Sequence, residues 1–423
     1  MDLFVACQVD KLVETWSECG TAFPIFPRSY TLADKKQNEG LLTEQLNWLI
    51  GELEISVQSS QNQDLLPGEA AQRFKQAGKV IFDMTDPQVN TIENEGIAAV
   101  GSQFFQSARR FDPGVSTADI FQASRNVWTM NYLQVLLDLP VRLTPSVFAY
   151  SMLYPVTDNY LDDPGISNEE KRMFNRRFTA WLMGENELPV NGKEQKVRQL
   201  VKMIESEYPR KTSAGVYESL LAIQSAQQKS LHQRYDPSKA AQIKNLRIAI
   251  EKGGTSVLAD GILTAGSLPE WQSEIIFNYG AFAQFMDDQE DVAGDLKQKA
   301  VSVFTEAARK GHLDQTMNRL FSFSRTVLKD LHRFDHSRSR PLMEISLKGI
   351  DLLLIDACAR TSKFYSRRYL AALEEFFPFR FKYLAEVRKQ IDNKKPLLTR
   401  FLEGVTRSSP QKVPEWALEL ALR

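Results

Sequence analysis

The chain has few of the residues that build disulfide frameworks or histidine-based metal sites. Its 423 residues include three cysteines and four histidines. The cysteines, Cys7, Cys19 and Cys358, are odd in number and fit no zinc-binding spacing. Reduced thiols in a cytosolic protein are the simplest interpretation.

Long apolar runs and a strong charge bias are also missing. No stretch of about 18 apolar residues occurs, so we expect no membrane-spanning helix. Charges at Asp2, Asp10, Lys11 and Glu14 interrupt the segment where a signal peptide needs an apolar core. The formal net charge of -1 gives no reason to expect binding to nucleic acid or to an anionic membrane. These features predict a soluble cytoplasmic protein.

Strand signals are scarce as well. Alternating apolar patterns joined by Asn-Gly or Asp-Gly turns are nearly absent. Apolar residues instead recur three and four positions apart over 39–58, 214–235 and 313–334, which is typical of helices. Ser116 and Ser167 each precede a carboxylate and a new apolar pattern, as helix N-caps do. The sequence therefore predicts an all-α protein of a dozen or more helices.

The segment FMDDQEDVAGD, residues 285–295, holds five acidic side chains. On a helix with about 100° per residue, its four aspartates share one face. Like charges at this spacing destabilise a helix, and flanking phenylalanines suggest partial burial, which is costly for carboxylates without a cation. A solvated acidic face is one explanation. A Mg²⁺ site is the other, because Mg²⁺ prefers carboxylate oxygens.

A second acidic cluster, DNYLDD, ends another apolar segment at residues 158–163. Asp158 and Asp162 are four residues apart, and Pro164-Gly165 stops the helix directly after Asp163. The helix dipole opposes anions in a last turn by about 0.3–1 kcal/mol each. A bound cation would offset this penalty, and two such clusters favour a metal site over two solvated faces.

Both clusters resemble motifs of the class I isoprenoid synthases. The segment YGAFAQFMDDQEDVAGD is similar to the second aspartate motif of trans-prenyl diphosphate synthases. DNYLDD resembles the first aspartate motif in the form found in large bacterial terpene synthases, with Asn159 inserted. The resemblance spans roughly residues 115–300. In the second motif the matching positions are Gly280, Phe282, Gln284, Asp287, Asp288, Asp291, Gly294 and Asp295.

This resemblance implies a class I terpenoid synthase-like helical bundle around a central apolar cavity. The catalytic bundle would span 111–400, with an N-terminal helical segment (1–110) packed on it and a tail (401–423) ending in a short helix. Three Mg²⁺ ions would bind Asp158, Asp162, Asp163, Asp287, Asp288 and Asp291. Of these, Asp158, Asp162, Asp287 and Asp291 would be catalytic, and Gly280, Phe282 and Gln284 would line the cavity.

Other segments resemble the parts of this superfamily that hold the diphosphate. IEKGGTSVLADG (250–261) is similar to a segment where a broken helix cradles the anion, which implicates Lys252, Gly253, Gly254 and Thr255. Packing of two helices through small residues is the alternative. KRMFNRRF supplies Arg176 and Arg177, and FYSRRY supplies Arg368 and Tyr369, which resemble a late Arg-Tyr pair. Either basic group can instead be a surface cluster.

The expected function is that of a Mg²⁺-dependent terpene synthase that ionises one prenyl diphosphate and yields a cyclic or linear terpene. A two-substrate prenyltransferase, either chain-elongating or head-to-head, is the alternative within the superfamily. The absence of an N-terminal Gly-Gly-Lys-Arg segment, which seats isopentenyl diphosphate in elongating synthases, favours the single-substrate reaction. A non-catalytic helical scaffold is the alternative of another class. The resemblance also allows a homodimer.

Overall fold

The structure, a computed structural model, describes residues 1–423 except 59–65, 164, 232, 234 and 409–423. Helices dominate, and no strand occurs among the described residues, so the predicted all-α class is confirmed. Contacts within the chain define two compact units. Unit 1 comprises Met1–Thr31 and Ser213–Phe377, and unit 2 comprises Leu32–Thr212 and Pro378–Arg423. The domain boundaries expected from the sequence, near residues 110 and 400, stay a prediction.

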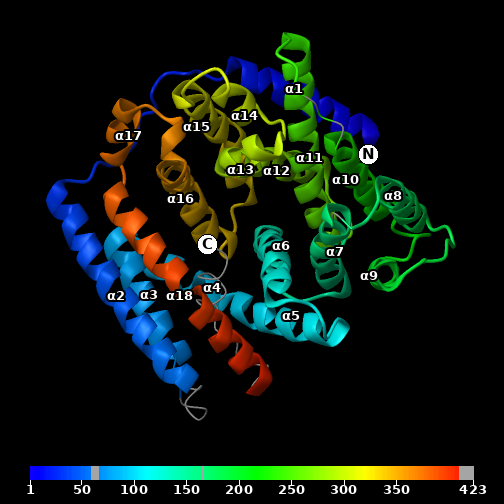
Figure 1. The fold of residues 1–423 in the computed structure, drawn as a ribbon, viewed down its shortest axis with the longest axis horizontal. Coiled ribbons are helices and arrows are strands. Elements are labelled where there is room, and N and C mark those ends of the chain that lie inside the picture. The colour runs from blue at the N-terminus through cyan, green and yellow to red at the C-terminus, as the bar shows by residue number, and fades with distance from the viewer. Residues whose placement is uncertain (59–65, 164, 232, 234, 409–423) are drawn as a thin grey trace. The chain divides into compact units, whose positions relative to one another are not determined.

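Unit 1 combines the first helix of the chain with a continuous run of later helices (Figure 1). Its elements are α1 (Asp2–Glu18), α10 (Ala214–Leu231), α11 (Lys239–Ala265), α12 (Glu270–Glu290), α13 (Val292–Gln298), α14 (Val303–Ala308), α15 (Asp314–Leu328), η1 (Lys329–Phe334), α16 (Ser339–Arg360), η2 (Ser362–Phe364) and α17 (Arg367–Glu374).

The core of unit 1 forms around α12. Helix α11 packs along α12, and α1 packs against α11, α12 and α15. The indole of Trp16 on α1 lies 4.6 Å from the ring of Phe285 on α12 and 5.4 Å from that of Phe323 on α15, between ring centroids. Aromatic pairs at these separations add about 0.5–1.5 kcal/mol beyond their area burial. The N-terminal helix is thereby an integral part of the core that supports α12.

Unit 2 contains the remaining helices. They are α2 (Leu32–Gln58), α3 (Leu66–Phe82), α4 (Asp86–Asn94), α5 (Ile97–Phe111), α6 (Thr117–Leu136), α7 (Pro145–Asp162), α8 (Asn168–Met183), α9 (Gly192–Glu207) and α18 (Phe381–Ser408). Helix α7 packs against α6 and α9, while α2 packs against α3 and α18.

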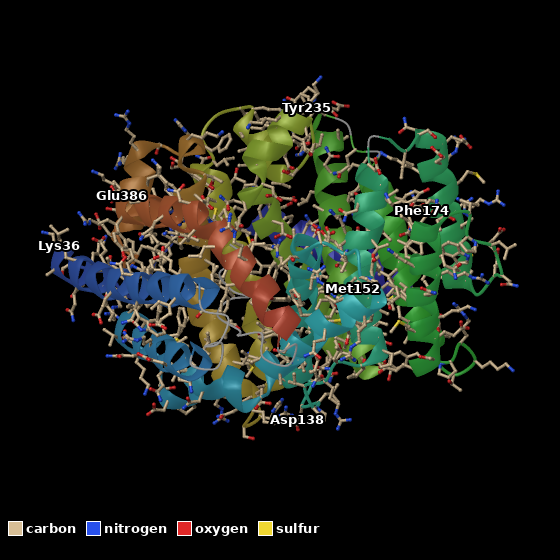
Figure 2. All side chains as sticks on the ribbon, turned by 60° about the horizontal axis from the view of Figure 1, so that its bottom comes forward. Lys36, Asp138, Met152, Phe174, Tyr235 and Glu386 are labelled. Carbon is tan, nitrogen blue, oxygen red and sulfur yellow. The ribbon has the colours of Figure 1, made fainter. Side chains whose placement is uncertain are left out.

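Side chains in unit 2 sort by burial as helix amphipathicity requires. Met152 on α7 and Phe174 on α8 are fully buried, whereas Lys36 on α2 and Glu386 on α18 are exposed (Figure 2). Glu39 is a buried exception on α2. Burial raises its pKa, but hydrogen bonds from the side chain and backbone N–H groups of Arg380 outweigh that effect and lower the pKa overall.

The helix N-caps that the sequence predicts are confirmed at two helix starts. The Ser116 hydroxyl accepts the N–H of Asp119 at 3.0 Å and begins α6. Ser167 and Glu170 form a capping box at the start of α8. The helical pattern over 313–334 becomes α15 followed by the 3₁₀ turn η1. Most of the predicted tail, 409–423, lies outside the described residues.

No helix in the described part of the chain is both long and apolar enough to cross a membrane.

Candidate metal and diphosphate site

Helices α11 and α12 approach each other through facing glycines. A Cβ atom added to Gly253 would lie 2.4 Å from the carbonyl oxygen of Gly280, and one added to Gly280 would lie 2.3 Å from that of Gly253. A Cβ on Gly254 would lie 2.3 Å from the ring of Phe277. Glycine fits at these positions without rearrangement, whereas a Cβ atom would overlap the facing backbone at Gly253 and Gly280 and the ring of Phe277 at Gly254.

These contacts change the interpretation of the segment 250–261. The expected break in the helix is absent, because α11 runs continuously from Lys239 to Ala265 and this whole range is described. The hydroxyl of Thr255 is buried and donates to the carbonyl of Glu251 at 2.6 Å. Helix packing, the alternative considered for this segment, accounts for Gly253, Gly254 and Thr255. Of the four residues predicted to hold the diphosphate here, Lys252 alone is partly open to solvent.

The end of α12 carries the acidic motif next to this packed region. Asp287 and Asp291 are exposed, whereas Asp288 and Asp295 are partly buried. Gln284 donates its amide Nε2 to Asp288 Oδ1 at 2.8 Å. The cavity-lining role predicted for Gln284, Gly280 and Phe282 stays a prediction. In unit 1 Gln284 touches Asp288, and Gly280 and Phe282 are buried.

The electrostatics single out Asp288. Burial raises the pKa of this carboxyl to about 7, and the nearby charges of Asp287 and Asp295 add to the rise. The hydrogen bond from Gln284 and the positive charge of Lys252 oppose it. Burial and the charge of Asp291 also raise the pKa of Asp295, again against Lys252. Negative charge on Asp288 is therefore incompletely compensated near neutral pH.

The predicted single helix over 285–295 is interrupted. Helix α12 ends at Glu290, and α13 begins at Val292, so Asp291 lies at the junction. The one-face arrangement nevertheless persists, because the N–H of Asp291 donates to Asp287 O and the N–H of Asp295 donates to Asp291 O, both at 2.9 Å. The exposed Asp291 therefore stays on the face of the other aspartates although α12 ends before it.

A group of buried side chains that sequence analysis did not identify lies behind the acidic motif. The amide Nε2 of Gln289 donates to Thr361 Oγ1 at 2.7 Å and to Tyr365 Oη at 2.9 Å. Arg360 at the end of α16 pairs with Glu290 and with Asp356. The only sequence signal for these contacts is that Gln289 and Glu290 point away from the aspartate face of the helix. Their partners could not be predicted, because they lie about 70 residues away in the sequence.

The first aspartate motif lies in unit 2, at the end of α7. The backbone of Asp158 and Asp162 is helical, and their side chains lie outside the described part of the structure. Asp163 caps the helix end: its carboxylate accepts the N–H of Gly165 at 2.8 Å and the ammonium of Lys193 at 3.2 Å. The Gly165 bond first, and then Lys193, lower the pKa of Asp163. These local partners satisfy Asp163 without a metal.

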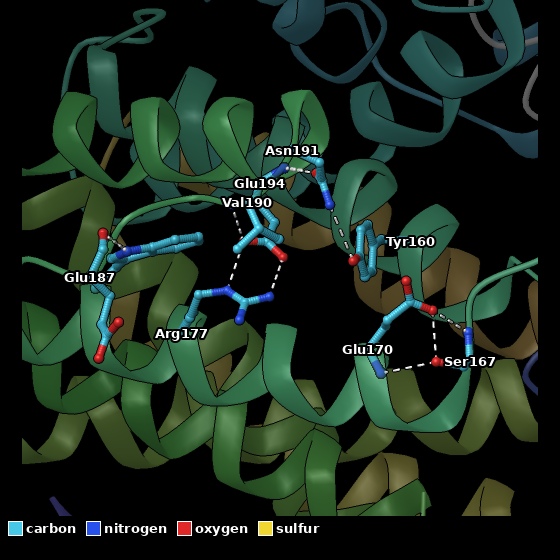
Figure 3. A network of polar contacts seen from close by, with 9 residues as sticks. Tyr160, Ser167, Glu170, Arg177, Glu187, Val190, Asn191 and Glu194 are labelled. Atoms are coloured by element: carbon cyan, nitrogen blue, oxygen red, sulfur yellow. Dashed lines mark hydrogen bonds and ion pairs between the residues drawn. The ribbon is translucent and has the colours of Figure 1, made fainter.

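The basic residues after the first motif have different surroundings. Arg177 forms two hydrogen bonds to the carboxylate of Glu194, of 2.8 and 2.5 Å, inside unit 2 (Figure 3). Glu194 is 0% exposed, and the Arg177 side chain is 11% exposed. The predicted anion contact of Arg177 would require this pair to open. Arg176 is exposed, and its guanidinium lies 3.9 Å from Glu187.

The two residues of the late Arg-Tyr pair, Arg368 and Tyr369, also differ in exposure. Tyr369 on α17 is buried, and its hydroxyl donates to Asn318 Oδ1 at 2.7 Å. Its ring stacks on that of Tyr365 at 5.8 Å. Tyr369 therefore has a packing role in unit 1, whereas Arg368 is exposed.

Carboxylate oxygens and the raised pKa of Asp288 fit a Mg²⁺ ion, because a cation would stabilise the ionised form. No group of three or more acidic, His or Cys side chains is arranged to hold a metal among the described residues. Mg²⁺ usually takes only one or two protein carboxylates and completes its shell with water and phosphate oxygens. One or two carboxylates from the set Asp287, Asp288 and Asp291 fit that mode better than an all-protein cage does.

Comparisons of the chain with models of protein families, with curated proteins and with solved structures give no match.

Proposed function

We propose that the chain is a Mg²⁺-dependent class I isoprenoid synthase that ionises a single prenyl diphosphate. The observation that carries the proposal is the incomplete compensation of Asp288. Its pKa is raised to about 7 by burial, while the acidic neighbours Asp287 and Asp295 oppose its ionisation further. Buried carboxylates are rarely kept in such a state unless a cation or a catalytic task requires them.

The residues of unit 1 would have distinct tasks. The exposed carboxylates of Asp287 and Asp291 would ligate Mg²⁺, and Gln284 would orient Asp288 through its hydrogen bond. Lys252 would interact with the diphosphate, because its positive charge lowers the pKa of both Asp288 and Asp295 and so acts on this end of α12. When bound, Mg²⁺ supplies Lewis-acid stabilisation to the departing diphosphate.

In unit 2, Asp158 and Asp162 stay the predicted metal ligands of the first motif. Asp163 is the weakest candidate of the six predicted ligands, because Gly165 and Lys193 already satisfy its carboxylate. Among the basic residues, Arg176 and Arg368 are exposed and remain candidates for the diphosphate. Arg177 and Tyr369 support the fold in this proposal.

The test is incubation with Mg²⁺ and prenyl diphosphates of several lengths, with and without isopentenyl diphosphate. We expect release of diphosphate and a hydrocarbon or alcohol from a single prenyl diphosphate. Longer diphosphates formed only in the mixture would identify a chain-elongating synthase. A product of doubled carbon number from the single feed would identify a head-to-head synthase, and no turnover with any feed would favour a non-catalytic scaffold.

A further inference from the structure

The buried side chains behind the acidic motif share one feature: they join the last turn of α12 to the end of α16. Gln289 is 0% exposed and lies between Asp288 and Asp291 in the sequence. At about 100° per residue it points roughly opposite to Asp287. Contacts made by Gln289 therefore fix the rotation of α12 about its axis without occupying the aspartate face.

The hydrogen bonds define the orientation of the Gln289 amide. The hydroxyl of Thr361 already donates to the carbonyl of Ala357 at 2.8 Å. The Tyr365 hydroxyl is hydrogen-bonded to the buried thiol of Cys358. The NH₂ group of Gln289 can only donate, so the oxygens of Thr361 and Tyr365 both accept from it.

The amide of Gln289 has one buried polar atom to which no described residue forms a hydrogen bond, a cost that an apolar side chain at this position would avoid. The carbonyl oxygen Oε1 of Gln289 is buried and has no hydrogen-bond partner among the described residues. Leaving such an oxygen unpaired costs about 1–3 kcal/mol. An apolar residue would fill the site without that penalty, so the amide is explained by the two bonds that it donates.

A second contact anchors the same turn. Glu290 pairs with Arg360, the last residue of α16, and Arg360 is also held by Asp356 at 3.1 Å. Residues 289 and 290 are therefore both tied to residues 360–365. They directly precede Asp291, where the helical path is interrupted between α12 and α13.

We infer that Gln289, with its acceptors Thr361 and Tyr365, positions the metal-binding carboxylates of α12; this inference rests on the proposed function. The residues touch no substrate, and they act by fixing the turn that carries Asp287, Asp288 and Asp291. Groups that hold metal ligands in place typically change metal affinity 10–100-fold when they are altered.

The test uses Mn²⁺ binding in the presence of pyrophosphate, followed by electron paramagnetic resonance, on the full chain. Thr361→Val removes the acceptor of Gln289, while Thr361→Ser keeps a hydroxyl and serves as the rescue. Tyr365→Phe removes the second acceptor. Tyr369→Phe is the matched control, because it loses a buried hydroxyl bond of similar length, to Asn318 on α15, and this hydroxyl makes no hydrogen bond to Gln289.

We expect Thr361→Val and Tyr365→Phe each to weaken Mn²⁺ binding by about 10-fold. Thr361→Ser and Tyr369→Phe should stay within about twofold of the unaltered chain. Hydrogen exchange of the amides of residues 287–295 should be faster in Tyr365→Phe than in Tyr369→Phe. This comparison remains informative even if Thr361→Val does not fold.

Equal Mn²⁺ affinity and equal exchange in Tyr365→Phe and Tyr369→Phe would overturn the inference. The double variant Asp287→Asn, Asp291→Asn separates this result from a failure of the proposed function. Loss of Mn²⁺ binding in that double variant, with normal binding in Tyr365→Phe, contradicts the positioning role alone. Normal binding in the double variant, or none in the unaltered chain, contradicts the proposed site and the inference with it.

Discussion

The two aspartate motifs contain the same residue type in opposite electrostatic states. In unit 2, Asp163 accepts hydrogen bonds from Gly165 and Lys193, and its pKa is lowered. In unit 1, burial and neighbouring carboxylates raise the pKa of Asp288 to about 7. The partners of Asp163 stabilise its ionised form, so this carboxylate needs no further ligand. The surroundings of Asp288 disfavour its ionised form, so this carboxylate is a candidate for binding a cation. This difference makes Asp288 a better candidate for cation binding than Asp163, although the two aspartates look equivalent in the sequence.

The largest expected effect comes from removing the exposed carboxylates of unit 1. Asp287→Asn with Asp291→Asn should lower turnover of a prenyl diphosphate at least about 100-fold, because metal ligands are lost. The fold should be kept, as both side chains are exposed. The corresponding pair in unit 2, Asp158→Asn with Asp162→Asn, should have a similar effect.

The matched control for these double variants is Glu14→Gln with Glu18→Gln. These carboxylates are also exposed and four residues apart, on α1, and their loss changes the net charge equally. Diphosphate release and circular dichroism should be measured for all variants. Normal turnover after replacement of Asp287 and Asp291 would show that the site is misplaced.

The next largest effect is a loss of stability when the buried ion pair of Arg177 and Glu194 in Figure 3 is broken. Replacing Arg177 by Met leaves Glu194 buried without its partner, which should lower the free energy of unfolding by about 3–5 kcal/mol. Adding Glu194→Leu should recover much of that loss, because an apolar pair of similar volume is often as stable as a buried ion pair. Chemical denaturation of the single and double variants measures both values.

The double variant also tests the role assigned to Arg177. If Arg177 bound the diphosphate, the affinity for pyrophosphate with Mg²⁺ would stay weak even after stability recovered. We expect that affinity to be unchanged.

A smaller effect is expected at the contact between α11 and α12. Gly254→Ala places a methyl group against the ring of Phe277, and overpacking of this kind costs about 1–3 kcal/mol. Gly215→Ala on α10 is the control, since nothing lies within 4 Å of the added atom. It should leave stability unchanged or raise it by up to about 1 kcal/mol. Thermal unfolding with and without pyrophosphate would show whether Gly254 instead governs anion binding.

Sequence analysis could predict helix class, several caps and both acidic motifs, because these depend on residues close together in the chain. Periodicity gave the helices, and Ser116 and Ser167 defined two helix starts. It could not choose between packing and anion binding at Gly253, since the answer depends on Gly280, 27 positions away. The partners of Arg177 and Gln289 are likewise set by tertiary contacts, which carry no local signal.

The pH dependence of stability should separate the two aspartates, Asp288 and Asp163. The folded-state pKa of Asp288 is raised. Below about pH 4 this carboxyl is protonated in both the folded and the unfolded chain, so it has little effect on stability. From about pH 4 to 7 it ionises in the unfolded chain first, so it destabilises the fold increasingly as the pH rises. The folded-state pKa of Asp163 is lowered, so it stabilises the fold above its unfolded pKa, and this contribution is lost as the pH falls through the folded pKa.

Without metal, Asp288→Asn should therefore raise stability at pH 8 relative to the unaltered chain and change it little at pH 4. Asp163→Asn should lower stability at pH 8 and have less effect in acid. Denaturant midpoints at the two pH values measure both effects. The same pH response in the two variants would remove the electrostatic contrast between the motifs.

The most direct test of the central claim is the thermal stability of the unaltered chain with Mg²⁺, with pyrophosphate and with both together. A site that joins Mg²⁺ to a diphosphate should raise the melting temperature much more with both ligands than with either one, because each completes the binding of the other. The double variant of Asp287 and Asp291 should lose this joint effect. No joint stabilisation of the unaltered chain would contradict the account and favour a helical scaffold whose aspartates are only solvated.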